Sequence, residues 1–376
     1  MDNNSKATKR KILYLGGFEL PDKNAAAQRV IANAMLLREM GFEVSLVGLT
    51  RDPKNVDGFI FGFRFEELKY PQGMNEWLYH VLFFCDNRLI DVYSPDYIVL
   101  YNFPAIASLR ILKYSHKRNI IVFHDLTEWE QTNGFSNRTI IKRLDTYLRM
   151  HYCVKRMDGV ITISRFLYNY YKNKVKTVLV PPTVDLNHFK WGRNRNLEVN
   201  NPISLIYAGS PGAGVKDRLD LIIDEVEKHK NINLNVVGLT KSQFFDLFQR
   251  TDVHYSNIFF KGRLSHLEAV QEVYKADFQM LIRDNNRKND AGFPTKLVES
   301  MACGTPVIAT IFSNITDYIQ DGNNAFIIDE KQSLCSILNK ISGMSASEII
   351  KMKRRCIEMI VFDYHYYKKE FAVLFN

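Results

Sequence analysis

A proline, a lysine and a single glutamate stand at the start of an apolar segment in residues 291–310, AGFPTKLVESMACGTPVIAT. Pro294 suits the first helical position, where its missing N–H costs nothing, and the apolar residues after it recur at helical spacing. Gly304 then ends the helix, and the β-branched run that follows predicts a short buried strand. The segment therefore predicts a helix that begins directly after a loop and leads into a sheet.

The start of this helix is predicted to attract an anion. The backbone N–H groups of Thr295, Lys296 and Leu297 find no partner within the helix, and the Lys296 ammonium adds positive charge beside them. Glu299 lies three residues beyond Lys296 on the same helix face, where its carboxylate can accept a hydrogen bond. A phosphate with a sugar hydroxyl beyond it fits this pattern. An ordinary helix with a solvated Lys–Glu pair fits it too, so the rest of the chain decides.

A glycine-rich turn precedes a basic residue in LIYAGSPGAGVKDR, residues 205–218. The glycines from Gly209 onward are typical of a phosphate-binding P-loop, but Lys216 is displaced by one residue and Asp217 replaces the Ser or Thr that would bind magnesium. The pattern therefore argues against a P-loop. Lys216 is either a phosphate ligand in another kind of site or an exposed loop lysine.

Three further sets of residues at strand ends are candidates for ligand contact. Gly16 and Gly17 end the first predicted strand and either allow a ligand to approach closely or form a plain tight turn. His124 ends an apolar predicted strand, at the edge where a parallel sheet delivers side chains to a ligand. Glu128 and Trp129 follow it, and they either reach a sugar or cap and cover the next helix.

The sequence offers no pattern for metal or nucleophilic catalysis. It contains no D-x-D pair, no cluster with metal-ligand spacing and no G-x-S-x-G. Its five cysteines are scattered, which argues against a disulfide framework and favours a reducing cytoplasm. Cys303 lies at the carboxyl end of its predicted helix, where the dipole disfavours a thiolate, so we interpret it as a packing residue. We therefore expect metal-independent chemistry, in which Lys216 and the helix amides before Leu297 replace a divalent cation.

Apolar strands alternate with helical segments along the whole chain of 376 residues, a length that predicts two domains. Strands are predicted at 11–17, 43–49, 97–102, 119–125, 159–164 and 176–182, and again at 204–210, 232–238, 257–263, 278–284, 306–310 and 325–329. This alternation predicts parallel sheets with helices on both faces. The expected fold class is α/β with two doubly wound, Rossmann-like domains, in which ligands bind beyond the carboxyl ends of the strands.

The segment 181–202 loses the alternation, is rich in Asn, Pro and Arg, and is predicted to link the domains. The irregular stretch 51–75 is not assigned. We expect an N-terminal domain at 1–187, a C-terminal domain at 188–357 and a final helix at 358–376 that returns toward the N-terminal domain.

The formal net charge of +9 indicates an anionic partner. Between residues 138 and 176 basic residues far outnumber acids, with aromatic residues interleaved. Such a surface suits anionic lipid headgroups, although a solvated face with its aromatic side chains in the core explains it nearly as well. No nucleic-acid-binding module accompanies the charge, so nucleic acid is not an expected partner. No apolar run reaches membrane-spanning length, so we expect any membrane contact to be peripheral.

Several motifs, in this order, resemble those of the family-four glycosyltransferases, which are retaining enzymes with the two-Rossmann-domain GT-B fold. They are GGF with AAAQRV, DGVITISRFLYNYY, VLVPPTVDLNHF, LIYAGSPGAGVKDR, FKGRLSHLEAVQEVYKADFQMLI, and KLVESMACGTPVIAT with DYIQDGNNAFII. The likeness spans nearly the whole chain, and the combination of ESMACGTPVIA with PPTVDLNHF is specific. It implies an N-terminal acceptor-side domain and a C-terminal domain that binds a nucleoside-diphosphate sugar, of UDP or GDP type, as co-substrate without a cofactor.

The resemblance also implies roles for individual residues. Glu299 occupies the place of the second acid of the family's E-x7-E motif, which binds the donor ribose, whereas Ala291 stands where the first acid is expected. Asp290 beside it, or a loop amide, would then hold the sugar hydroxyls. Lys216 occupies the place of the diphosphate-binding residue, and His124 that of a histidine beside the donor sugar. The donor-binding candidates in chain order are Gly16, Gly17, Gly209, Arg218, Asp290, Gly292, Phe293, Thr295, Lys296 and Leu297.

The leading hypothesis is a cytoplasmic, peripherally membrane-associated glycosyltransferase that moves a sugar to a glycan or lipid-linked glycan with retention, in cell-surface polysaccharide synthesis. Its catalytic candidates are His124, Lys216 and Glu299, and Glu128 and Trp129 are acceptor-side candidates. Two alternatives stay open. One is a nucleotide-sugar-binding partner or scaffold with impaired catalysis, and the other is a sugar-nucleotide epimerase of the same fold.

Overall fold

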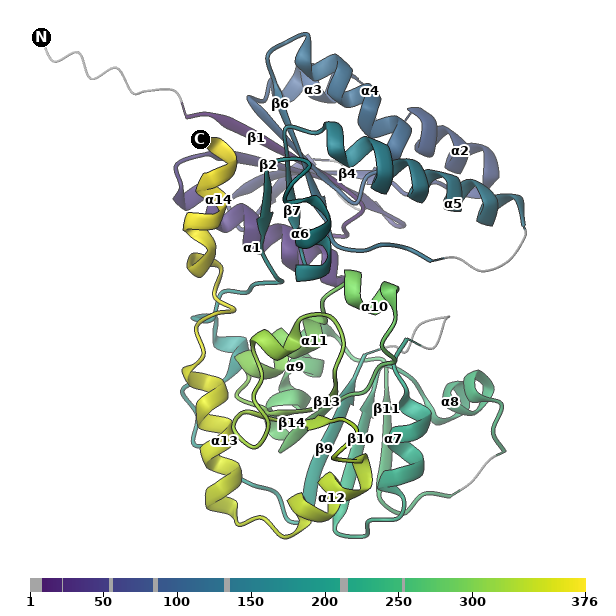
Figure 1. Cartoon of the computed structure of the whole chain (residues 1–376), viewed down its shortest axis with the longest axis vertical. Helices are drawn as coiled ribbons and strands as arrows, with labels where there is room; N and C mark the ends of the chain where they lie inside the picture. The colour runs from purple at the N-terminus through teal and green to yellow at the C-terminus, as the bar shows by residue number, and fades with distance from the viewer. Residues whose placement is uncertain are drawn as a thin grey trace, which may run out of the picture. The chain divides into compact units, whose positions relative to one another are not determined.

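The computed structural model describes residues 9–21, 23–53, 57–83, 87–131, 136–209, 216–251 and 254–376. The chain divides into two compact units (Figure 1): unit 1 comprises Met1–Thr183 with Tyr364–Asn376, and unit 2 comprises Val184–Asp363. Each unit is built around one mostly parallel sheet with helices on both faces. The predicted fold class, α/β with two doubly wound domains, is confirmed.

Unit 1 holds an eight-stranded sheet in the order β3-β4-β2-β1-β5-β6-β7-β8. Its strands are β1 (Lys11–Gly16), β2 (Glu43–Thr50), β3 (Asp57–Ile60), β4 (Phe63–Lys69), β5 (Tyr97–Tyr101), β6 (Ile121–Leu126), β7 (Gly159–Thr162) and β8 (Thr177–Leu179). Its helices are α1 (Ala25–Glu39), α2 (Gly73–Phe83), α3 (Asn87–Tyr93), α4 (Ala105–His116), α5 (Asn137–Leu148), α6 (Arg165–Tyr171) and, at the C-terminus, α14 (Lys368–Phe375).

The stretch that the sequence left unassigned contains the hairpin β3–β4. The two strands pair antiparallel, and β4 then pairs parallel with β2. Phe61 and Gly62 form the two-residue turn, with φ values of 49° and 78°. Hairpin turns of this hand usually carry Asn-Gly or Asp-Gly, so Phe-Gly gives no signal that a pattern search would recognise.

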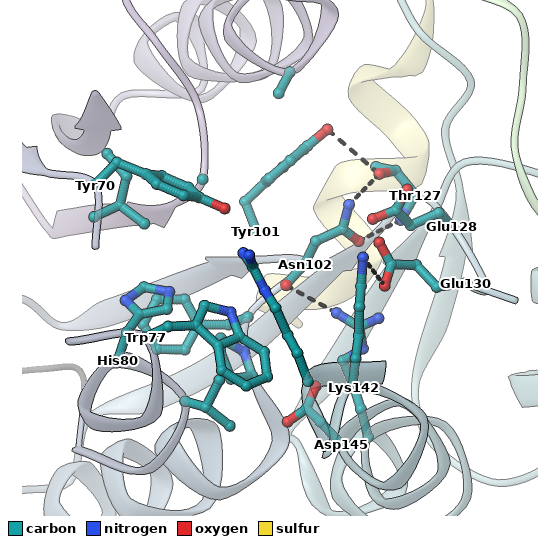
Figure 2. Close-up of a pocket in the computed structure, with 18 of the residues that line it drawn as sticks. Tyr70, Trp77, His80, Tyr101, Asn102, Thr127, Glu128, Glu130, Lys142 and Asp145 are labelled. Atoms are coloured by element: carbon teal, nitrogen blue, oxygen red, sulfur yellow. Dashed lines mark hydrogen bonds and ion pairs between the residues drawn. The ribbon is translucent and has the colours of Figure 1, made fainter. Parts of the chain in front are cut away.

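The two faces of the unit 1 sheet are covered by different helices. Asp125 of β6 pairs with Arg29 of α1 at 2.8 Å, whereas Val122 on the opposite face belongs to a core cluster with Ile111 of α4. The C-terminal α14 lies on the α1 side, because the ring of Phe375 lies 5.5 Å from that of Phe123. Residues of α2 and α5 line a pocket at the carboxyl ends of β5 and β6 (Figure 2).

Unit 2 holds a six-stranded, fully parallel sheet in the order β11-β10-β9-β12-β13-β14. Its strands are β9 (Ile203–Ala208), β10 (Ile232–Val237), β11 (Ile258–Gly262), β12 (Phe278–Leu281), β13 (Val307–Thr310) and β14 (Ala325–Ile328). Its helices are α7 (Leu219–Val226), α8 (Lys241–Phe248), α9 (His266–Lys275), α10 (Arg287–Ala291), α11 (Thr295–Ala302), α12 (Leu334–Ser342) and α13 (Ala346–Glu358).

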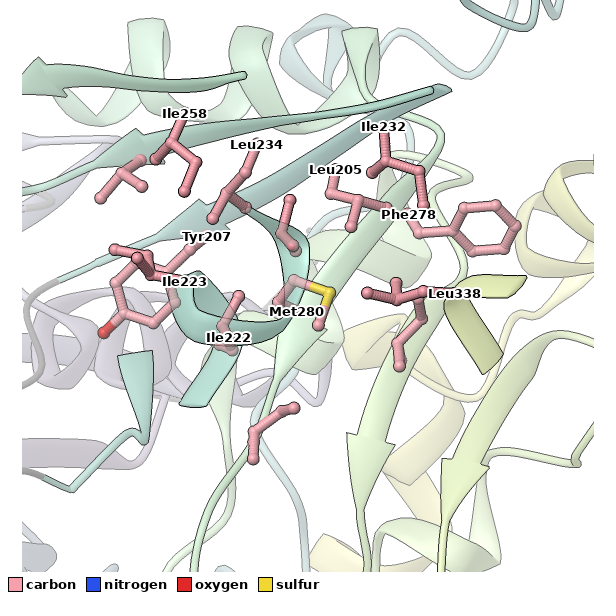
Figure 3. Close-up of a cluster of buried hydrophobic side chains, with 14 of the residues drawn as sticks. Leu205, Tyr207, Ile222, Ile223, Ile232, Leu234, Ile258, Phe278, Met280 and Leu338 are labelled. Carbon is pink, nitrogen blue, oxygen red and sulfur yellow. The ribbon is translucent and has the colours of Figure 1, made fainter. Parts of the chain in front are cut away.

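The core of unit 2 forms where alternate strand residues meet α7 and α12 (Figure 3). Leu205, Leu234 and Met280 point from three neighbouring strands toward Ile223 of α7 and Leu338 of α12, and all five side chains are fully buried. Burying side chains of this size stabilises a fold by roughly 1.5–3 kcal/mol each. This packing fixes the strand ends that carry the polar residues described below.

The predicted linker segment 181–202 is packed on unit 2 from Val184 onward. Trp191 is fully buried and donates its indole N–H to the Asp185 carbonyl at 2.7 Å. Arg195 donates to the carbonyl of Cys303 at 3.0 Å. These anchors hold the segment on unit 2. In the described part of the chain, no helix has the length and apolar character needed to cross a membrane.

Candidate active site

A buried ionic cluster lies at the carboxyl end of the unit 2 sheet. Asp217, 2% exposed, accepts hydrogen bonds from the Tyr207 hydroxyl at 2.9 Å and from Arg283 Nε at 2.5 Å. Its second oxygen also pairs with the Lys296 ammonium. Burial raises the pKa of Asp217, but the charges of Lys296 and Arg283 outweigh burial and lower it to about 2. One carboxylate and two cations leave one positive charge in excess.

Gly209 makes room for the lysine of this cluster. Its φ is +129°, a conformation that side chains other than glycine rarely adopt, and a Cβ atom there would lie 2.4 Å from Cε of Lys296. The glycine is therefore needed for Lys296 to reach Asp217. This gives Gly209 a definite local role, which the glycine-rich pattern did not reveal.

The two basic residues of the glycine-rich motif differ in their surroundings. Arg218 pairs with Asp220 at 2.8 Å and with Asp284 at 3.3 Å, and its hydrogen bond with Asp220 raises its pKa. Two carboxylates therefore share its charge. Lys216 is half-buried and directly precedes Asp217 in the chain. The loop 210–215 between Gly209 and Lys216 lies outside the described residues.

Helix α11 presents one polar face in an otherwise buried segment. Within residues 291–302 only Thr295, Lys296 and Glu299 are partly exposed. The N–H of Leu297 was predicted to have no partner within the helix, but this prediction is wrong. It donates a hydrogen bond to the carbonyl of Pro294 at 3.1 Å. Pro294 takes the N-cap position instead of the predicted first helical position, so the helix begins one residue later, at Thr295. The first turn of the helix is tight, and the N–H of Leu297 makes its hydrogen bond within this turn.

Glu299 has a partner that the sequence did not reveal. Its Oε1 lies 3.0 Å from Nε2 of His266, the first residue of α9, and both side chains are less than one-fifth exposed. A capping box between Ser265 and Glu268 fixes the start of α9 and with it the position of His266. The carboxylate is therefore held in place from one side.

The loop before α11 is more ordered than predicted, because Asp290 and Ala291 belong to the short helix α10. Oδ1 of Asp290 accepts the N–H of Ser313 at 2.8 Å, and the Ser313 hydroxyl donates to the carbonyl of Gly292 at 2.6 Å. The Asp290 carboxylate thus ties α10 to the loop after β13. Ala291 is fully buried, and Phe293 is 7% exposed.

The side chain of Phe293 packs in the protein interior. Its ring makes an edge contact with Tyr318, with ring centroids 5.3 Å apart, and lies 6.3 Å from the ring of Phe362. Any ligand contact of Phe293 would therefore come from its backbone.

One group of possible metal ligands occurs in the described residues, away from these side chains. Ligand atoms of Glu225, His229 and Cys335, on α7, the turn after it and α12, all lie within 4.8 Å of one another. The sequence analysis missed the group because Cys335 is distant in the chain. Glu225 already pairs with Lys228 at 2.9 Å and with His229 at 3.4 Å, so the side chains partly satisfy one another.

The pocket of unit 1 has a volume of about 560 Å³ and mixes aromatic faces with charged and amide groups (Figure 2). We name it the acceptor-side pocket, after the role that the sequence resemblance implies for the N-terminal domain. Asn102 and Thr127, which follow β5 and β6, are joined by two hydrogen bonds of 2.5 and 2.9 Å. The aromatic and charged residues of the lining include Tyr70, Trp77, Tyr101, Glu128, Glu130, Arg138, Lys142, Asp145 and Arg149.

Two pairs of neighbouring residues were predicted to contact ligands in unit 1, and in each pair only one residue lines the pocket. Glu128 lines the acceptor-side pocket, whereas Trp129 is 8% exposed and packs 5.0 Å from the ring of Tyr170. Gly17 lines the pocket, but Gly16 belongs to β1, where an added Cβ would lie 2.5 Å from the Tyr101 carbonyl oxygen. Gly16 thus permits close packing of two strands.

His124 lies within β6 and is not its last residue. The strand continues to Leu126, and His124 is fully buried on the α4 side of the sheet. Burial, together with the charge of Arg149, lowers the pKa of His124 to about 3, so the ring is neutral. Within the described residues neither ring nitrogen makes a hydrogen bond of good geometry. The predicted strand ended at residue 125, one residue before the observed end at Leu126.

Comparisons with known proteins agree with this architecture. A family described as glycosyl transferases group 1 matches residues 198–359, and one described as glycosyltransferase family 4 matches residues 26–188. A search of curated proteins found no match.

Three solved structures illustrate the likeness of fold. Sucrose-phosphate synthase from Thermosynechococcus elongatus superposes with a TM-score of 0.70 at 12% identity over 98% of both chains. Anabaena HepE in complex with UDP and glucose gives 0.62 at 14% identity over 97% of this chain and 98% of that one. The lipopolysaccharide outer core galactosyltransferase WaaB gives 0.60 at 15% identity over 97% and 99%.

Proposed function

Because the chain belongs to the group 1 glycosyltransferases and has the GT-B fold, we propose that it transfers a sugar from a nucleoside-diphosphate sugar to a glycan or lipid-linked glycan. The proposed donor is of UDP or GDP type, and the anomeric configuration is retained. The polar face of α11 carries the proposal: Thr295, Lys296 and Glu299 are the partly exposed residues of a buried segment, next to a cluster with excess positive charge.

The diphosphate is proposed to bind at the start of α11. Negative charge grows on a leaving nucleoside diphosphate as the glycosidic bond breaks, and positive charge fixed in advance stabilises it. Lys216, Lys296 and the N–H of Thr295 supply that charge in our proposal, without a divalent cation. Arg218 has a smaller part, because Asp220 and Asp284 share its charge.

The ribose is proposed to bind Glu299. His266 engages Oε1, so Oε2 is the oxygen assigned to a ribose hydroxyl. A carboxylate held from one side loses less conformational freedom when the ligand binds. HepE, a structural neighbour, is described with UDP and glucose, which favours a uridine nucleotide as the first donor to test.

The acceptor is proposed to bind in the acceptor-side pocket. Tyr70, Trp77 and Tyr101 offer aromatic faces for sugar rings, and Asn102 and Glu128 offer hydrogen-bonding groups for hydroxyls. The role of His124 beside the donor sugar stays a prediction. Its burial and neutrality favour a role in positioning neighbours, one of which is Arg149 in the pocket lining.

A peripheral position at the cytoplasmic face of the membrane, in cell-surface polysaccharide synthesis, is also proposed. Helix α5 turns a stripe of apolar residues outward: Ile140 is 42%, Leu144 58% and Tyr147 62% exposed. Arg138 and Arg143 are exposed on the same helix. Apolar side chains flanked by arginines are typical of helices that lie on anionic bilayers.

Ala291 is the observation that favours a second candidate. The family motif places an acid here, but this alanine is fully buried. A protein without that acid could bind the nucleotide sugar and act as a partner or scaffold, or isomerise the donor as an epimerase does.

The test begins with thermal shift in UDP, GDP and ADP and their hexose conjugates, because a ligand at 100 times its Kd adds about 2.7 kcal/mol of stability. Release of nucleoside diphosphate is then followed with a crude lipid-glycan extract as acceptor. Transfer supports the proposal. Tight nucleotide binding without turnover supports the alternative of a binding partner or scaffold. Donor isomerisation without an acceptor supports the epimerase alternative. If no nucleotide binds, the donor site is wrong.

A further inference from the structure

A second cavity of unit 1 lies against the opposite face of α2 from the acceptor-side pocket. It has a volume of about 850 Å³ and is bounded by the end of β4, by α2 and by α3, so we name it the α2–α3 cavity. Trp77 and Val81 of α2 face the acceptor-side pocket, whereas Asn75 and Tyr79 face the α2–α3 cavity. Residues two positions apart point to roughly opposite sides of a helix, so α2 is the wall between the two spaces.

The α2–α3 cavity is suited to an uncharged, apolar ligand. Its apolar lining comes from Leu68, Pro71, Tyr79, Leu89 and Val92. The charged residues of the lining are two acids and two bases, which cancel: Glu66, Glu76, Lys69 and Arg88. Both acids already serve the fold, since Glu66 accepts a bond from the Tyr93 hydroxyl and Glu76 one from the N–H of Gln72.

His80 is common to both linings, so the two spaces adjoin along this side of α2. Its ring borders the acceptor-side pocket and the α2–α3 cavity. Burial lowers the pKa of His80 to about 4, so the imidazole is neutral near pH 7. An elongated ligand can therefore lie across α2 with a polar end on one side and an apolar end on the other.

We propose that the acceptor is a lipid-linked saccharide whose sugar occupies the acceptor-side pocket and whose hydrocarbon chain occupies the α2–α3 cavity. This inference rests on the proposed function and narrows its acceptor to an amphiphile. The mixed aromatic and polar lining of one space and the largely apolar lining of the other, whose charges cancel, match the two halves of such a molecule. The exposed apolar stripe of α5 lies on a neighbouring helix, since Arg138 of α5 contacts the Trp77 ring at 5.5 Å.

The test uses methyl, hexyl, octyl and decyl β-glucosides below their micelle concentrations, titrated calorimetrically into the full chain. Each methylene transferred from water to an apolar site strengthens binding by about fourfold at most. We expect affinity to rise at least tenfold from the hexyl to the decyl compound. Val92→Asp and Tyr79→Asp place a carboxylate in the lining at positions 63% and 64% exposed, where folding tolerates it. Each is expected to lower decyl glucoside affinity at least fivefold.

Val373→Asp is the matched control, because Val373 is 49% exposed on α14 and lines neither space. It should leave the whole series unchanged. An affinity that does not depend on chain length overturns the inference. So does a chain-length dependence that survives both lining variants, since the chain then binds elsewhere, such as on α5. Binding of UDP and GDP is measured on the same preparations, so a failure of the donor site is seen separately.

Discussion

Nε2 of His266 and Oε1 of Glu299 lie 3.0 Å apart, although the two residues come from different helices of unit 2. If this contact orients Glu299 for the ribose, His266→Ala should weaken nucleoside diphosphate binding by about tenfold, the value of one hydrogen bond to a charged group. Isothermal titration with UDP and GDP measures the effect. His116→Ala is the control, because His116 makes an equally short contact of 3.0 Å with Asp158 in unit 1. Equal nucleoside diphosphate affinities of His266→Ala and His116→Ala would show that His266 does not orient Glu299.

Gly209→Ala should lower both stability and nucleotide affinity. The substitution places a Cβ atom 2.4 Å from Cε of Lys296 at a positive φ, so the lysine must move away from Asp217. We expect the free energy of unfolding in urea to fall by roughly 1–3 kcal/mol. Gly322→Ala is the control, because Gly322 also has a positive φ, 66°, but a Cβ there meets nothing within 4 Å. A fully stable Gly209→Ala variant would show that Lys296 can reach Asp217 without the space that Gly209 leaves.

Lys216→Ala and Lys296→Met should separate ligand binding from folding. Lys216→Ala is expected to weaken diphosphate binding by at least tenfold and to leave the urea midpoint unchanged. Lys296→Met should lower both, because it removes one of the two cations that compensate buried Asp217. Calorimetry and urea unfolding of both proteins decide the matter, with exposed Lys230→Ala as the control. Unaltered UDP and GDP affinity in Lys216→Ala would refute the diphosphate assignment.

Asp217 should make stability fall at low pH. Its pKa is lowered from 3.8 to about 2 in the folded chain, so its contribution is complete above about pH 4 and is lost as the pH falls toward 2. A shift of nearly two pKa units corresponds to roughly 2.5 kcal/mol. The difference in unfolding free energy between wild type and Asp217→Asn should therefore shrink between pH 5 and pH 2.5. A constant difference over this range would show that the carboxylate is not stabilised by its cations.

Leu144→Glu should detach the protein from anionic vesicles if α5 docks on a membrane. The leucine is 58% exposed in the centre of the apolar stripe, so the substitution leaves the fold intact. When phosphatidylserine vesicles are sedimented, the wild-type protein should be found in the vesicle pellet at low salt, and a smaller fraction of it at high salt. Phe259→Glu, 46% exposed on β11, is the control. A wild-type chain that stays in the supernatant at all salt concentrations would exclude the docking surface.

The sequence predicted the strands well because in parallel sheets most are continuous apolar runs. Each predicted strand overlaps an observed strand, from β1 to β14. The hairpin β3–β4 escaped because Phe61 and Gly62 lack the usual turn residues. The limits of single elements were also less certain. The predicted strand 119–125 ends one residue before β6 does, and His124 is fully buried within β6 instead of lying at its end.

The polar contacts were harder to predict, because they join residues that are distant in the chain. His266 and Glu299 are 33 positions apart, and Arg283 and Asp217 are 66 apart. Only the strand order brings these pairs to one edge of the sheet. Asn102 carried a local signal, since it is the polar last residue of the predicted apolar strand 97–102. Trp77 carried none, because its place in the pocket depends on how α2 packs.

The last thirteen residues of the sequence belong to unit 1, which otherwise ends at Thr183. Leu374 fills the space above Gly159, and Tyr364 donates a hydrogen bond to Glu39 at 2.7 Å. During synthesis the N-terminal portion must therefore wait, incompletely assembled, until all of unit 2 has left the ribosome. A chain that stopped after Asp363 would contain every residue of unit 2, but its unit 1 would lack Tyr364–Asn376 and the contacts that these residues make with Glu39 and Gly159.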